Sequence, residues 1–218
     1  MMNIRLRNFA VAASALLLVL SGSRVSAQDS VTLRLIKDDA TRDVVRSALG
    51  RATATGLPVG PLISKALEGI AKRASTATIR GAMAALEKRL RRANALLAPD
   101  PTVDELSAGA DALSVGVSDR TLKQMRAAAP RRSIALELGV LTELVARGVP
   151  RDKASKMVLE LMARGANGAQ LTALSSAVQA DVAAGIKPDV ALDLRGRGVM
   201  SLLPPSPSAS VLQPRSPE

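Results

Sequence analysis

The sequence "RGVPRDKASKMVLELMARGA", residues 147–166, has a counterpart earlier in the chain, "TGLPVGPLISKALEGIAKRA" at residues 55–74. The two stretches align without a gap at a constant offset of 92 residues. The identical pairs are Gly56/Gly148, Pro58/Pro150, Leu67/Leu159, Glu68/Glu160, Ala71/Ala163 and Ala74/Ala166. Self-similarity at a fixed offset is the signature of an internal repeat. The stretch therefore predicts a structural unit that occurs twice.

The repeated stretch has the punctuation and periodicity of a helix. A glycine can end the preceding helix in a left-handed conformation, and a proline suits the first position of the next helix. After the proline, apolar residues recur at i, i+3, i+4 and i+7, which places them on one helical face. In the second copy they are Leu159, Met162, Ala163 and Ala166.

A second helix follows each copy after a short polar break, which is "STAT" at 75–78 and "NGAQ" at 167–170. Its apolar residues again share one face, and in the second copy they are Leu171, Leu174, Val178 and Val182. Two amphipathic helices joined by a short loop predict an antiparallel hairpin. We therefore expect the repeat to cover 55–92 and 147–184.

The whole chain favours helices, because alanine and leucine have high helix propensity. Patterning and punctuation predict helices near 38–49, 58–73, 77–97, 102–114, 118–128, 132–147, 150–164, 168–184 and 188–194. The predicted fold class is all-α, with duplicated antiparallel helical hairpins packed as an irregular helical repeat or bundle. The glycines of "GANG" (165–168) and "RGRG" (195–198) are predicted to lie in turns.

The beginning of the chain predicts export. Residues 1–27 contain two early arginines, a central apolar run and a small-residue cleavage site ending at Ala27, as a secretory signal peptide does. The apolar run is shorter than the ~20 residues that a membrane-spanning helix needs. Cleavage would remove three arginines and no acid, so the formal net charge would fall from +11 to +8. We expect a periplasmic or extracellular protein that does not span the membrane.

The remaining segments are divided by composition. Residues 28–37 are predicted to form an extended N-terminal arm, and 38–200 a single all-helical domain. Proline and serine dominate 201–218, which predicts a disordered tail.

The composition excludes several kinds of chemistry. The chain has no histidine, cysteine, tryptophan or tyrosine, and its one phenylalanine lies in the predicted signal peptide. It therefore lacks the usual ligands of zinc, copper and haem, and nucleophilic sites built on histidine or cysteine. No cofactor, metal site or catalytic residue is expected. The methionines, Met83, Met125, Met157 and Met162 among them, are expected to fill the core in place of aromatic residues.

Glu68 and Glu160 occupy equivalent positions in the two copies, so a pair of catalytic carboxylates across a cleft is one hypothesis. Each glutamate, however, precedes a cation by four residues, Lys72 in one copy and Arg164 in the other. Glutamate before a base at this spacing favours a surface ion pair on a helix. The ion pair is the preferred interpretation, and a hydrolase dependent on Asp or Glu is the weakest alternative.

Six basic residues are the candidate binding residues: Lys88, Arg89, Arg91, Arg92, Arg131 and Arg132. An anionic partner such as lipid head groups, lipopolysaccharide or an acidic polymer would suit them. A solvated helix face is the preferred interpretation of the first four, because Leu86, Leu90, Ala93 and Leu97 form an apolar stripe opposite. Nucleic acid is not expected, since the chain lacks aromatic stacking platforms.

Taken together, the sequence predicts an exported, non-enzymatic helical-repeat protein that mediates protein–protein interaction or scaffolding in the bacterial envelope. Binding of anionic envelope components through a basic helix face is the first alternative.

Overall fold

The computed structural model describes residues 36–204. The predicted signal peptide, nearly all of the N-terminal arm and most of the C-terminal tail lie outside this range. Within it the chain forms nine α-helices and no strand, so the all-α class is confirmed.

Each predicted helix has a counterpart in this part of the chain. The helices are α2 (Asp39–Ala54), α3 (Gly60–Ala71), α4 (Thr76–Leu96), α5 (Val103–Ser114), α6 (Asp119–Ala128), α7 (Ala135–Ala146), α8 (Arg151–Ala163), α9 (Gly168–Ala183) and α10 (Pro188–Ser201). Most ends agree with the prediction within three residues. The exceptions are α2, which continues to Ala54 where the sequence predicted an end at 49, and α10, which continues to Ser201 where the sequence predicted an end at 194.

Glycine ends several of these helices, as the sequence predicted. Gly148 has a φ of 92°, and the N–H of the following Val149 donates to the carbonyl of Leu144 at 3.1 Å. This bond returns to the last turn of α7 and buries Val149 against the core. The proline prediction is less accurate. Pro150 immediately precedes α8, but α3 begins only at Gly60, two residues after Pro58.

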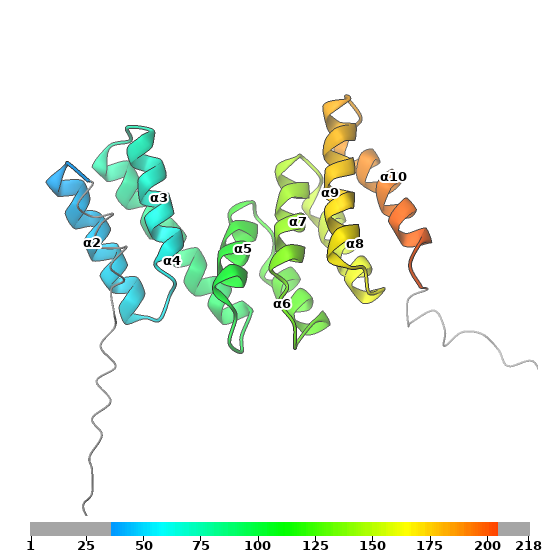
Figure 1. The fold of residues 1–218 in the computed structure, drawn as a ribbon, viewed down its shortest axis with the longest axis horizontal. Helices are drawn as coiled ribbons and strands as arrows, with labels where there is room; N and C mark the ends of the chain where they lie inside the picture. Colours follow the sequence, from blue (N-terminus) through cyan, green and yellow to red (C-terminus); the bar gives the residue numbers. More distant parts are fainter. Residues whose placement is uncertain (1–35, 205–218) are drawn as a thin grey trace, which may run out of the picture.

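The helices form an elongated row, with α2 at one end and α10 at the other (Figure 1). One series of neighbours runs α2, α4, α5, α7, α9 and α10, each helix packing against the next. A second series contains α6, α8 and α10, and α8 also packs against α7. At the other end of the row, α3 packs against α2 and α4.

The two predicted hairpins differ in their packing. Helices α3 and α4 pack extensively against each other, as a hairpin requires. In the second copy, α9 has its extensive contacts with α7 and α10, whereas α8 packs on α6, α7 and α10. The predicted arrangement of duplicated antiparallel hairpins is therefore not confirmed. Both copies contain two helices, but the helices of the two copies pack against different neighbours in the row.

The core is aliphatic, with methionine among its largest buried residues. Met83 and Met125 are almost completely buried, and Met157 and Met162 are buried as well, which confirms the prediction for them. The predicted apolar stripe of α4 is also buried along its whole length. The face predicted for α3 is wrong in part. Leu67 is 40% exposed, because α3 turns Leu62 and Ala66 into the core instead.

The prediction that "RGRG" forms a turn is wrong, since these residues continue α10. Gly196 is buried there, and a Cβ at this position would lie only 2.3 Å from Cε of Met157 on α8. Glycine thus permits close helix contact instead of a turn. The preceding Arg195 donates twice to the Asp181 carboxylate on α9, at 2.7 Å each. The prediction for "GANG" is correct for residues 165–167, which connect α8 to α9, whereas Gly168 is the first residue of α9.

Candidate functional site

The predicted basic residues of α4 do not share one face. Successive residues of an α-helix are rotated by about 100°, so residues 88–92 point in several directions around the helix. Lys88, Arg91 and Arg92 are exposed, and Arg89 is half-buried. The four side chains therefore have different surroundings.

Arg91 is engaged by an acid from its own helix. It forms an ion pair with Glu87, which is buried beneath it. Glu87 also accepts from Arg51 of α2, at 3.2 Å, and so joins α2 to α4. Burial raises the pKa of Glu87, but hydrogen bonds from Arg91 and Arg51 outweigh it and hold the pKa below its ordinary value. Arg91 thus neutralises a buried carboxylate that supports the fold.

Arg92 is also paired, with Asp119 at the start of α6. Its Nε lies 2.7 Å from the Asp119 carboxylate. The hydrogen bond to Asp119 raises the pKa of Arg92 further above its ordinary value. Arg92 therefore connects α4 to α6 and already has an acidic partner within the chain.

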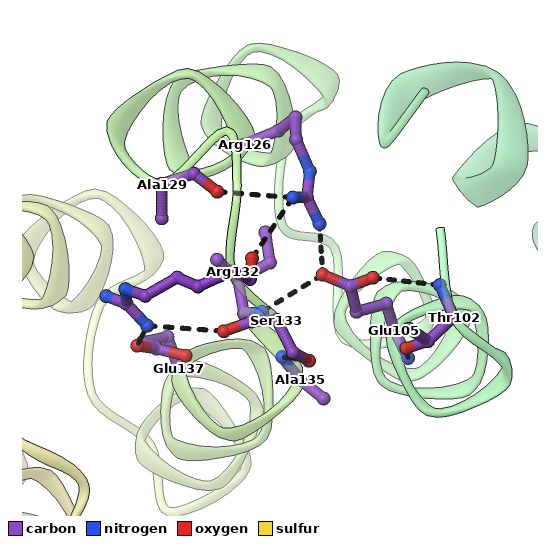
Figure 2. Close-up of polar contacts among 9 residues, drawn as sticks. Thr102, Glu105, Arg126, Ala129, Arg132, Ser133, Ala135 and Glu137 are labelled. Atoms are coloured by element: carbon purple, nitrogen blue, oxygen red, sulfur yellow. Dashed lines mark hydrogen bonds and ion pairs between the residues drawn. The ribbon is translucent and has the colours of Figure 1, made fainter. Parts of the chain in front are cut away.

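Arg131 and Arg132 lie in the connection between α6 and α7. Arg132 forms an ion pair with the buried Glu137 of α7 (Figure 2). Arg131 is exposed and has no ion pair within the described part of the chain. Of the six predicted binding residues, only Lys88 and Arg131 are thus both exposed and without an acidic partner there.

A polar centre beside Arg132 was not predicted as a site. Glu105 on α5 is only 2% exposed and forms an ion pair with Arg126 of α6 (Figure 2). Its carboxylate also accepts from the backbone N–H groups of Thr102, at 2.8 Å, and Ile134, at 3.0 Å. Burial raises the pKa of Glu105, but these hydrogen bonds hold it below its ordinary value.

This centre joins three helices in one network. Arg126 also donates to the carbonyls of Ala129 and Arg132, both at 3.2 Å, so it closes the end of α6 (Figure 2). The sequence does contain a signal for part of it, because Thr102 and Glu105 have the spacing of a capping box, which the structure forms. Every hydrogen bond of this network joins groups of the chain itself, so the network stabilises the fold, and within the described residues only the buried Nε of Arg126 is left without a partner in it.

Arg89 has a different environment from the other basic residues. It lines a cavity of about 290 Å³ between α3, α4 and α5. Its Nε is buried and has no hydrogen-bond partner in the described part of the chain. Asp111 of α5 lines the same cavity and forms no ion pair with a described residue. Burial raises the pKa of Asp111, although Arg89 and Lys65 act to lower it.

The two repeated glutamates are ion-paired, as predicted. Glu68 lies 2.6 Å from both Lys65 and Lys72, and Glu160 lies 3.2 Å from Arg164. Hydrogen bonds from the two lysines lower the pKa of Glu68 to about 2. Helices α3 and α8, which carry the glutamates, lie towards opposite ends of the row (Figure 1). The structure therefore does not bring the two carboxylates together across a cleft.

The terminal helix α10 carries exposed apolar side chains that sequence analysis did not single out. Val190 and Leu194 are each 49% exposed and lie one turn apart. Ile186 lies four residues before Val190, just ahead of the helix. Leu202, which is 77% exposed, directly follows the last residue of the helix. The opposite side of α10 buries Ala191 and Leu192 in the core. We call residues 186, 190, 194 and 202 the α10 stripe.

Two further searches of residues 36–204 were negative. None of the helices there is both long enough and apolar enough to span a membrane. No group of three or more acidic residues in that range is arranged to hold a metal ion.

Comparison of the chain with models of protein families, with curated proteins and with solved structures yields no match.

Proposed function

We propose that this is an exported, non-enzymatic helical protein that binds another protein in the bacterial envelope through the α10 stripe. Export rests on the sequence of residues 1–27, which has the features of a secretory signal. The similarity of 55–92 to 147–184 suggests how the row arose. In this proposal a two-helix unit was duplicated, and the two copies later came to pack against different neighbouring helices.

The α10 stripe is the observation that carries the proposal. A row of packed helices needs a polar outer face on its last helix, because no further helix covers it. Helix α10 is the last in the described row (Figure 1). Even so, Val190 and Leu194 on this helix are half exposed. Apolar side chains one turn apart can anchor a partner helix. The stripe therefore has the features expected of a docking face.

The flanking charges define the chemistry of the partner. Lys187 and Arg197 are exposed beside the stripe and form no ion pair with a described residue. Asp189 and Asp193, on the same helix, are both within ion-pair distance of Lys153 on α8. The free charge next to the stripe is thus positive. The matching partner is an amphipathic helix with an apolar face and acidic flanks.

The anionic-polymer alternative has less support. Arg91, Arg92 and Arg132 are each occupied by an acid of the chain itself. Arg89 has no ion pair with a described residue but is half-buried in the lining of a cavity, which leaves Lys88 and Arg131 as the exposed unpaired residues of the six. These two lie on different elements, and separated cations attract a polyanion only weakly at physiological salt.

Site-specific photocross-linking in the exporting cell tests the proposal. A photoreactive residue at Leu194 should give an adduct with one different protein, and the same residue at Leu67 should not. Leu67 is a matched control, because it is a leucine of similar exposure on α3. The adduct should persist at about 0.5 M salt, since apolar contacts are not screened. Equal adducts from both positions, adducts between two copies of this chain, or loss at high salt would contradict the proposal.

A further inference from the structure

The cavity between α3, α4 and α5 contains two opposite charges that do not satisfy each other. Arg89 and Asp111 both line it and interact electrostatically, but neither forms an ion pair with a described residue. The buried Nε of Arg89 also has no hydrogen-bond partner there. Buried polar groups are normally satisfied, and here the unsatisfied group lies beside a cavity, where a bound ligand can supply the missing partner.

The other charged groups of the cavity already have partners. Lys65 and Glu68 form an ion pair with each other at 2.6 Å, and Glu68 also binds Lys72 outside the cavity lining. The opposite charges of Lys65 and Glu68 thus offset each other in the cavity lining. Arg89 and Asp111 therefore remain in the lining as one cation and one anion without an ion pair to a described residue.

Hydroxyl groups supply the rest of the polar lining. Ser107 and Ser114 donate to carbonyls of their own helix, at 2.9 and 2.7 Å, so their oxygens remain available as acceptors. The lining contains no aromatic side chain on which a sugar ring could stack. The volume of about 290 Å³ lies just below the usual range for ligand sites, roughly 300–1,000 Å³. The occupant must be small and polar.

We propose that this cavity binds a small zwitterion, a free α-amino acid, with the ligand carboxylate on Arg89 and the ligand ammonium on Asp111. A guanidinium can donate two parallel hydrogen bonds to a carboxylate, which suits Arg89 better than a lysine. The ligand ammonium supplies the ion pair that Asp111 does not form with any described residue. The hydroxyls of the lining accept the remaining ammonium hydrogens.

Calorimetry with the purified exported chain and each of the common amino acids, at low ionic strength, tests this site. At least one amino acid should bind with a Kd below about 1 mM. Its N-acetyl derivative, without the ammonium, and its amide, without the carboxylate, should each bind at least tenfold more weakly. These derivatives mimic the two ends of a peptide, so equal binding of either would overturn the assignment to a free amino acid, as would no binding at all.

Two substitutions assign the binding to the cavity. Arg89→Leu and Asp111→Asn should each weaken binding at least tenfold, and the neighbouring Lys88→Leu should not. Asp111 is exposed as a residue, so its variant keeps the test valid if Arg89→Leu does not fold. Unchanged binding in Asp111→Asn would overturn the proposal. The α10 stripe is separate from this cavity, so that result would leave the proposed protein-binding function intact.

Discussion

Replacing Glu105 by glutamine should destabilise the domain more than any other single loss of charge. The carboxylate is buried and accepts from Arg126 and from the backbone N–H groups of Thr102 and Ile134. Glutamine has the same length, but it carries no charge and its NH₂ group would face donors. Arg126, itself only 12% exposed at its side chain, would become a buried cation without a counter-ion.

The expected cost is about 3–5 kcal/mol, as for other buried ion pairs that lose one partner. A domain of this kind has a total stability of roughly 5–15 kcal/mol, so the loss would be a large part of it. Urea unfolding has a slope of about 1–3 kcal/mol per molar. The midpoint should therefore fall by at least about 1 M.

Far-ultraviolet circular dichroism is the appropriate assay, because the chain has no tryptophan or tyrosine for fluorescence. Asp104→Asn is the matched control. It removes the same charge from the same first turn of α5, but at an exposed position, and should cost less than about 1 kcal/mol. Equal urea midpoints for the Glu105→Gln and Asp104→Asn variants would refute the role of the network.

The remaining predictions concern pH and helix ends. Because its folded-state pKa is lowered, Glu105 contributes stability above its unfolded pKa of about 4.5 and loses it as pH falls towards the folded value. Urea titrations at pH 3 to 6 should show this loss in the native chain and a smaller one in Glu105→Gln; parallel curves would contradict it. Gly185, with a φ of 91° and free space around it, should cost about 1–2 kcal/mol when changed to alanine. Gly81→Ala, inside α4 and also without a clash, should instead stabilise by about 0.5–1 kcal/mol, and thermal melts showing the same sign for both would be inconsistent with this account.

The positions of the helices could be predicted because their boundaries are local. Glycines such as Gly148 end helices by their own conformation. Residues such as Ser75 and Asn167 cap the next helix because their side chains accept hydrogen bonds from backbone N–H groups three residues further on. The predictions fail where the role of a residue depends on its packing against a segment that is distant in the sequence. Gly196 looks like a turn residue in the sequence, but the approach of Met157 from α8 explains why glycine is needed inside α10.

The candidate site shows the same division. Ion pairs at helical spacing, such as Glu160 with Arg164, could be predicted from the sequence because one helix positions both groups. The partner of Arg92 is Asp119, two helices further along the chain, and no local pattern indicates it. The basic cluster therefore appeared more available for binding than it is. The unsatisfied Arg89 and the exposed Leu194 likewise depend on which helices pack beside them.

The central claim is that the α10 stripe binds a partner protein, and the most direct test measures affinity with the partner isolated by cross-linking. Burying two such side chains contributes about 1.5–3 kcal/mol each, so a Val190→Glu and Leu194→Glu double variant should bind at least tenfold more weakly. The Leu67→Glu variant should bind like the native chain, and both should keep the native helical content. Undiminished affinity in the double variant would contradict the account.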